Sequence, residues 1–74
     1  LYGRALRGLG MARYEAGDTG GAGEAFKRVI AEHPGISLTA TTYAWLGQWC
    51  LDQGQFDDAA RAFERLLAEH PEYP

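Results

Sequence analysis

The feature that most constrains the fold is an internal repeat with a period of 37 residues. Shifting the sequence by this distance, without a gap, aligns eleven pairs of identical residues between positions 9–34 and 46–71. Two of them are glycines, one is a phenylalanine, and four are consecutive in the tetrapeptide Ala-Glu-His-Pro at positions 31–34 and 68–71. Unrelated helices share only scattered alanines and leucines, so this agreement indicates two copies of one structural unit.

The apolar residues within each unit recur with helical spacing. In the first half of the second unit they lie at i, i+3, i+4, i+7 and i+8, and the other halves carry comparable stripes. The sequence therefore predicts an all-α fold in which each unit is a helix, a turn and a second helix. The residues on these stripes are Leu6, Leu9, Ala22, Phe26, Val29, Ile30, Tyr43, Leu46, Gly47, Cys50, Leu51, Phe56, Ala59, Ala60, Phe63, Leu66 and Leu67.

Turn and cap residues are predicted to mark the ends of the helices in both units. Gly17 and Gly54 are predicted to end the first helices, because glycine takes left-handed backbone angles at little steric cost. Asp18 can cap the helix that follows by accepting backbone N–H bonds. Pro34 and Pro71 are predicted to stop the second helices, since the residue before a proline is disfavoured in helical angles.

Two further expectations concern helix starts. Three glycines at positions 20, 21 and 23 lie where the second helix of unit one begins, and each lowers helix propensity, so this end is expected to fray. In the connector between the units, Ser37 or Thr39 could cap the next helix. Gly10 and Gly47 fall in the middle of predicted helices, where close packing against a partner helix is the expected compensation. 

Composition excludes several classes of function. With 46% hydrophobic and 23% charged residues the chain is of ordinary globular type, and it has no apolar run that could cross a bilayer. A net charge of −3 without a basic cluster argues against nucleic acid as a partner. The single Cys50 forms no internal disulfide and leaves the redox compartment open. A chain of this size without a staple is expected to need neighbouring structure for stability, and its start at Leu1 is typical of a piece of a longer protein.

The motif residues of both units resemble the tetratricopeptide repeat. The resemblance covers nearly the whole chain as a single domain over residues 1–74, with repeat one at about 3–36 and repeat two at about 40–73. Unit one departs from the family pattern at Arg13 and Thr19, which weakens its core. The matching residues are Leu6, Leu9, Gly10, Gly17, Ala22, Phe26, Val29 and Pro34 in unit one and Tyr43, Leu46, Gly47, Cys50, Gly54, Phe56, Ala59, Phe63, Leu66 and Pro71 in unit two.

The resemblance implies a right-handed α-α superhelix, or solenoid, whose first helices line a concave groove. By this resemblance the chain binds a peptide or partner protein, uses no cofactor or metal, and performs no catalysis. Arg4 and Arg7 would suit a ligand with an acidic end and an apolar anchor; the alternative is that they are solvated surface charges. The residues expected to face the groove are Arg4, Arg7, Met11, Tyr14, Glu15, Thr41, Ala44, Gln48, Leu51 and Asp52.

Arg7 and Met11 stand where the chaperone-binding members of the family have lysine and asparagine, so a chaperone-tail receptor is not supported. The longer period and the Trp-Leu-Gly run at positions 45–47 resemble the repeats of bacterial cell-envelope proteins, such as Tol-Pal associated coordinators and outer-membrane-assembly lipoproteins. The compartment is then either the cytoplasm or the bacterial periplasm and envelope.

Other candidate residues favour structural interpretations. Trp45 and Trp49 lie four residues apart and are expected to pack against an adjacent repeat, with a ligand-binding aromatic patch as the alternative. His33 and His70 recur at equivalent places and are interpreted as helix C-terminal caps rather than metal ligands.

Two more positions could suggest catalysis. Cys50 is interpreted as a small core residue, because a nucleophile needs a base and an orienting group around it. Asp57 and Asp58 point in different directions on a helix and favour its N-terminal dipole. Neither position therefore indicates an enzyme.

The leading hypothesis is a non-enzymatic interaction module. The alternatives are a self-association module, in which chains pair as homo-oligomers through their exposed end helices, and an accessory repeat domain of a larger bacterial enzyme or envelope protein. Phe63, Leu66 and Leu67 support the first alternative, because no following helix in the sequence would cover them.

Overall fold

A computed structural model describes residues 2–73, which contain four α-helices and no strand. These are α1 (Tyr2–Glu15), α2 (Thr19–Glu32), α3 (Ala40–Asp52) and α4 (Phe56–Glu69). The chain divides into two compact units, Leu1–Ile36 and Ser37–Pro74. Residues 1 and 74, which the single-domain prediction includes, lie outside the described residues.

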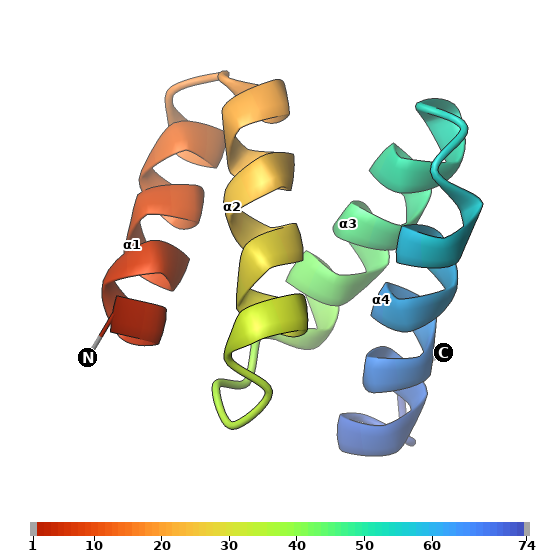
Figure 1. Ribbon diagram of the computed structural model, residues 1–74. Coiled ribbons are helices and arrows are strands. Elements are labelled where there is room, and N and C mark those ends of the chain that lie inside the picture. Colours follow the sequence, from red (N-terminus) through yellow and green to blue (C-terminus); the bar gives the residue numbers. More distant parts are fainter. Residues whose placement is uncertain (1, 74) are drawn as a thin grey trace. The chain divides into compact units, whose positions relative to one another are not determined.

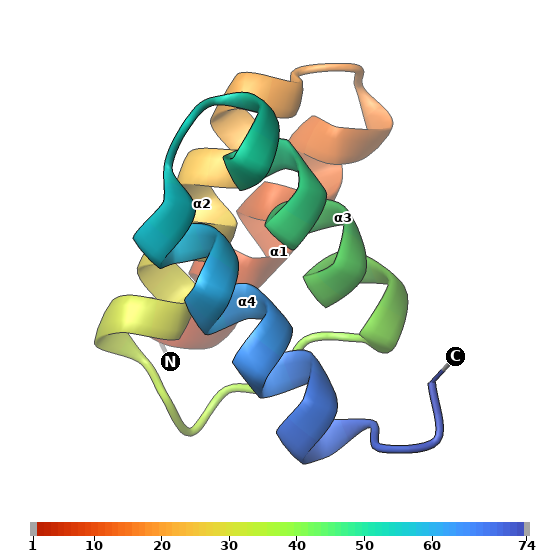
Figure 2. The ribbon, with the colours of Figure 1, turned by 90° about the vertical axis from the view of Figure 1, so that its right-hand side faces the viewer.

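Each unit is a pair of antiparallel helices that lie side by side (Figures 1 and 2). We call α1 with α2 hairpin one, and α3 with α4 hairpin two. The predicted all-α class, with a helix, a turn and a helix in each unit, is confirmed.

In each hairpin a glycine of the first helix faces a phenylalanine ring of the second. A Cβ atom at Gly10 of α1 would lie 2.7 Å from Cε1 of Phe26 on α2. At Gly47 of α3, a Cβ would overlap the ring of Phe63 on α4. The close packing predicted at both mid-helix glycines is confirmed, and the ring occupies the space that any other side chain would need.

Both turns end the first helix in the same way. Gly17 has a φ of 88°, in the left-handed region where glycine is favoured, and Gly54 has a φ of 76°. In hairpin one the backbone N–H of Asp18 donates to the carbonyl of Arg13 at 2.8 Å, and that of Gly17 donates to Tyr14 at 3.1 Å. The corresponding two bonds recur around Gly54. This pair of bonds is the Schellman motif, which satisfies carbonyls that the helix end leaves free.

The predicted N-caps are present. The Asp18 carboxylate accepts a hydrogen bond from the backbone N–H of Gly21 at 3.0 Å, and Thr39 Oγ1 accepts one from Thr42 at 3.2 Å. Gln55 precedes α4 without a side-chain cap bond. Of the three helices that follow α1, both α2 and α3 therefore start on a side-chain cap that the sequence indicates.

The start of α2 differs from the expectation of a frayed end. The helix is formed from Thr19 onward, through all three glycines. Gly21 lies so close to the Asp18 carboxylate that a Cβ there would overlap it, and Gly23 is buried. Gly21 therefore has a packing reason, because it allows the capping carboxylate to come close to the helix backbone.

The buried apolar residues come from both helices of each hairpin and from Leu38, in the segment before α3. In hairpin two the largest fully buried side chains are Tyr43, Leu46 and Cys50, each 0% exposed. Leu66, which was expected to lack cover, is only 8% exposed. The buried apolar residues are Leu6, Ala22, Ala25, Phe26, Val29, Leu38, Tyr43, Leu46, Cys50, Ala59, Ala62 and Leu66.

Parts of the predicted apolar stripes lie at the surface rather than in the core. Leu9 is 42% exposed and Leu51 39%, while Phe56 and Leu67 reach 67% and 68%; Ala60 is also exposed. The reason is geometric: a stripe of five or six residues spans more of a helix surface than one neighbouring helix covers. Residues at its edges then remain in solvent.

We predict that Gly47→Ala destabilises the protein by about 1–3 kcal/mol, because the new methyl group overlaps the Phe63 ring and forces the helices apart. Gly8→Ala is the matched control: Gly8 lies on α1 with no atom near its Cβ position, so alanine there should stabilise by about 0.5–1 kcal/mol. Urea unfolding followed by circular dichroism measures both. Equal effects of the two substitutions would contradict the packing role of Gly47.

Candidate functional site

The ten residues predicted to face a ligand all lie on α1 and α3, the first helices of the two hairpins. Their spacing along each helix is i, i+3, i+7, i+10 and i+11, which places each set of five on one side of its helix. Arg7 and Ala44 are half-buried and the other eight are exposed. On α1 the set is Arg4, Arg7, Met11, Tyr14 and Glu15; on α3 it is Thr41, Ala44, Gln48, Leu51 and Asp52.

The α1 face combines cationic and apolar side chains. Arg4 and Arg7 lie on its N-terminal half, and Met11 and Tyr14 follow, each 44% exposed. A guanidinium group can bind a carboxylate through two parallel hydrogen bonds, and an exposed methionine or tyrosine offers an adaptable apolar contact. This face is chemically suited to a ligand that has both an acidic and an apolar group.

The α3 face is of a different character. Gln48 Nε2 donates to Asp52 Oδ1 at 3.1 Å, one turn along the helix. Leu51 is the exposed apolar residue of this face, and Thr41 adds a hydroxyl group. The α3 face therefore offers amide, hydroxyl and carboxylate groups, and no cation.

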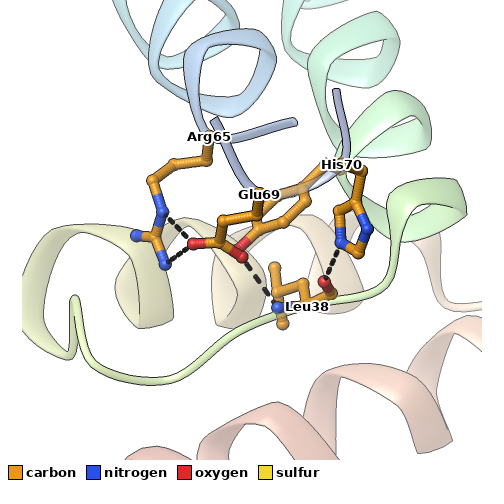
Figure 3. Close-up of polar contacts among 5 residues, drawn as sticks. Leu38, Arg65, Glu69 and His70 are labelled. Atoms are coloured by element: carbon orange, nitrogen blue, oxygen red, sulfur yellow. Dashed lines mark hydrogen bonds and ion pairs between the residues drawn. The ribbon is translucent and has the colours of Figure 1, made fainter. Parts of the chain in front are cut away.

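A polar cluster that the sequence interpretation did not identify lies in hairpin two (Figure 3). The Tyr43 hydroxyl accepts a hydrogen bond from the backbone N–H of Leu38 at 3.1 Å and donates to Glu69 Oε1 at 2.7 Å. Arg65 Nε and Nη2 both lie 2.7 Å from Glu69 Oε2. His70 Nε2 lies 3.1 Å from the carbonyl oxygen of Leu38. Both polar groups of Leu38 are therefore bonded, which anchors the segment leading into α3.

Ring contacts reinforce this cluster. The Arg65 guanidinium lies 5.7 Å from the centre of the Tyr43 ring, and the ring of His70 lies 6.0 Å from it. A cation over an aromatic face is attracted by the ring's quadrupole. The side chains of Arg65 and Glu69 are only 19% and 24% exposed, so water screens their ion pair less than it would a pair on the open surface.

The environment shifts the pKa of two groups in the cluster. Burial raises the pKa of Tyr43, since it disfavours the phenolate, and the hydrogen bond to Glu69 acts in the same direction. Burial also acts to raise the pKa of Glu69. The hydrogen bonds from Tyr43, Arg65 and Ser37, together with the charge of Arg65, outweigh it and lower this pKa.

Hairpin one carries a more open version of the cluster, assembled around Tyr2. Arg28 Nη2 donates to the Tyr2 hydroxyl at 2.9 Å and to Glu32 Oε1 at 3.4 Å, and these contacts raise the pKa of Arg28. The His33 ring lies 5.4 Å from that of Tyr2. Tyr2 is 54% exposed, and the side chains of Arg28 and Glu32 are about half exposed. The arginine, glutamate and histidine of the two clusters therefore occupy equivalent repeat positions. The tyrosine, in contrast, comes from a different turn of the first helix.

The interpretation of the two histidines as helix C-terminal caps is confirmed for their backbone but not for their rings. Each residue follows its helix at the C-cap, where the backbone N–H of His33 donates to Val29 and that of His70 to Leu66. The His70 ring bonds the Leu38 carbonyl, which belongs to no helix end. Nε2 of His33 is buried and has no hydrogen-bond partner among residues 2–73. The main chain does the capping, and each ring packs on a tyrosine.

The tryptophans, the cysteine and the paired aspartates make contacts that suit structural roles. Trp45 and Trp49 stack on each other, with ring centres 6.1 Å apart and planes at 17°, and both are half-buried. Cys50 is fully buried, as expected for a core residue. Asp57 and Asp58 lie in the first turn of α4, where negative charge is favoured, and Asp58 pairs with Arg61 at 3.2 Å.

Two features are absent from residues 2–73. These residues contain no group of three or more His, Cys, Asp or Glu side chains arranged to hold a metal ion. No helix in this part of the chain combines the length and the apolar character needed to cross a bilayer.

The chain belongs to the tetratricopeptide repeat family. The family model described as tetratricopeptide repeat matches residues 13–74, from the last turn of α1 through α4. Members of this family are generally protein-interaction modules and typically have no catalytic activity. Neither the curated proteins nor the solved structures gave a match to the chain.

We predict that Tyr43→Phe lowers the free energy of unfolding by about 1–3 kcal/mol, because it leaves the backbone N–H of Leu38 buried without an acceptor. Tyr73→Phe is the matched control, since Tyr73 is 39% exposed and its hydroxyl makes no hydrogen bond within the described part of the chain. Urea unfolding measures the difference. Equal stability of the two variants would contradict an anchoring role for the Tyr43 hydroxyl.

We also predict an acid-dependent contribution from Glu69. Because its pKa is lower in the folded state than its ordinary value of 4.5, the ionised group stabilises the fold above that value, and the contribution is lost as pH falls through the folded pKa. The stability difference between the wild type and Glu69→Gln should therefore shrink between about pH 7 and pH 3. Glu72→Gln, at an exposed glutamate, serves as the control. A difference that stays constant with pH would contradict this account.

Proposed function

We propose that this chain is a non-enzymatic protein-interaction module that binds a peptide or partner protein through the exposed faces of α1 and α3. Membership of the tetratricopeptide repeat family supports the general function. The observation that carries the more specific proposal is the composition of the α1 face, which presents two arginines beside exposed Met11 and Tyr14.

The ligand class follows from this chemistry. Arg4 forms no ion pair or side-chain hydrogen bond within residues 2–73, so its guanidinium is available for a carboxylate of the ligand. Met11 lies two turns further along the same side of the helix and offers an apolar contact. A peptide with an acidic group about two helical turns from a large apolar side chain would engage both.

Repeat one is proposed to span residues 3–36 and repeat two residues 40–73, as parts of one interaction domain. The period of 37 residues and the Trp-Leu-Gly run at positions 45–47 support a bacterial cell-envelope setting as the finer proposal. In that setting the module would be an adaptor or an accessory repeat domain of a larger protein.

The test is selection from a random peptide library displayed on phage, with the 74-residue chain as the target. We expect enriched peptides to carry an acidic residue together with a large apolar one. Arg4→Glu combined with Arg7→Glu should lower their affinity at least about tenfold, because an attractive charge pair becomes repulsive. Selection on this variant should favour basic residues instead.

The control variant is Arg61→Glu, which reverses an exposed arginine on α4. It should leave the affinity of the selected peptides unchanged. Failure to enrich any peptide, or an equal loss of affinity in the Arg61 variant and the double variant, would overturn the proposal. Circular dichroism confirms that all the variants remain helical.

A further inference from the structure

The sequence contains two sulfur atoms, and the fold gives them opposite environments. Cys50 is 0% exposed in the interior of hairpin two, whereas Met11 on α1 is 44% exposed. A dissolved oxidant reaches a sulfur atom only where solvent does, so susceptibility to oxidation follows exposure. Met11 is therefore the sulfur at which a small two-electron oxidant would modify this chain.

The helix surface beside Met11 is open. Its neighbours one turn toward the N-terminus are Arg7, at i−4, and Gly8, at i−3. Gly8 has no side chain, and apart from its chain neighbours and the helix backbone no described atom lies within 4 Å of its Cβ position. In the other repeat, the bulky Trp45 stands at the position equivalent to Gly8. Repeat one therefore lacks the side chain that occupies this neighbouring position in repeat two.

The repeat also shows that a first helix accepts a polar side chain at the position of Met11. The equivalent residue on α3 is Gln48, which is exposed and donates to Asp52 Oδ1 at 3.1 Å. A methionine sulfoxide, like a glutamine amide, carries a polar oxygen near the end of an unbranched side chain. We therefore expect oxidation of Met11 to change the chemistry of the α1 face and to leave the helix folded.

We propose that Met11 is a site of reversible oxidation that controls peptide binding, an inference that rests on the proposed function. The oxidant is hydrogen peroxide. A lone pair of the thioether sulfur attacks one peroxide oxygen, the O–O bond breaks, and the sulfur–oxygen bond of the sulfoxide forms. The proton on that oxygen passes to the departing hydroxide, which leaves as water. Sulfur is oxidised by two electrons and the peroxide is reduced by two.

The reverse step needs two thiols, which become a disulfide while the sulfoxide oxygen leaves as water. Methionine sulfoxide reductases catalyse this reduction, so the modification can be removed. The thioether that results is chemically identical to the original one. Binding is therefore expected to return with the reduced form.

The sulfoxide would weaken both contacts of the proposed peptide site. Its polar oxygen replaces an apolar surface, and burying that oxygen against a large apolar side chain of the ligand is unfavourable. Arg7 lies one helical turn away, where its guanidinium can donate to the new oxygen and compete with the carboxylate of the ligand. The oxidised chain should therefore bind peptides with an acidic and an apolar group more weakly.

The test compares reduced and peroxide-treated forms of the 74-residue chain. Mass spectrometry of tryptic fragments should place one added oxygen on Met11 and none on Cys50. Calorimetric titration with the peptides selected on phage should show that oxidation weakens binding at least about fivefold. Treatment with a methionine sulfoxide reductase and a thiol should restore the original affinity. Equal helical content by circular dichroism shows that the chain remains folded.

Two substitutions separate the oxidation of Met11 from other effects of peroxide. Met11→Gln introduces the residue type that Gln48 supplies at the equivalent position, and it should bind the peptides as weakly as the oxidised wild type before any treatment. Met11→Leu keeps an apolar side chain of similar volume and should bind like the reduced wild type. Peroxide should leave the affinity of the Met11→Leu chain unchanged.

The outcomes distinguish this inference from the function on which it rests. Equal affinity of the oxidised and reduced chains, an unmodified Met11 after peroxide treatment, or a peroxide effect that persists in Met11→Leu would overturn the inference and leave the proposed function intact. A selection that enriches no peptide would overturn both.

Discussion

The contact between a helical glycine and a phenylalanine ring determines how each hairpin closes. Gly10 with Phe26, and Gly47 with Phe63, bring the two helices of a hairpin so close that no Cβ fits between them. A glycine in a helix interior lowers helix propensity, and the packing of the ring offsets that cost. Because the contact recurs at equivalent positions, both hairpins place the outer faces of their first helices in the same way.

The polar cluster shows how two copies of one unit diverge. In hairpin two, Tyr43 lies in the interior and its hydroxyl joins Glu69 to the segment before α3. In hairpin one, the hydroxyl of the exposed Tyr2, at the start of α1, accepts a hydrogen bond from Arg28. Equivalent arginine, glutamate and histidine residues thus surround a buried tyrosine in one copy and an exposed tyrosine in the other.

Much of the fold could be predicted from the sequence because its signals are local. The turn glycines, the Asp18 and Thr39 caps and the close approach at Gly47 all depend on neighbouring residues or on helical spacing. The exposure of Leu9 could not, since periodicity shows which residues share a side of a helix and not which sides are covered. The polar cluster was missed for a similar reason: it joins residues up to 32 positions apart, for which a single sequence holds no signal. The predicted binding residues lie on exposed helix faces, and their contact with a ligand stays a prediction.

The account as a whole depends on both hairpins being closed by the same glycine–phenylalanine contact, since that contact presents the first-helix faces to solvent. The most direct measurement is a nuclear Overhauser spectrum of the isotope-labelled chain. It should show strong cross-peaks between the Gly10 Hα protons and the Phe26 ring, and between those of Gly47 and the Phe63 ring. Cross-peaks in one hairpin alone, or in neither, would contradict the claim.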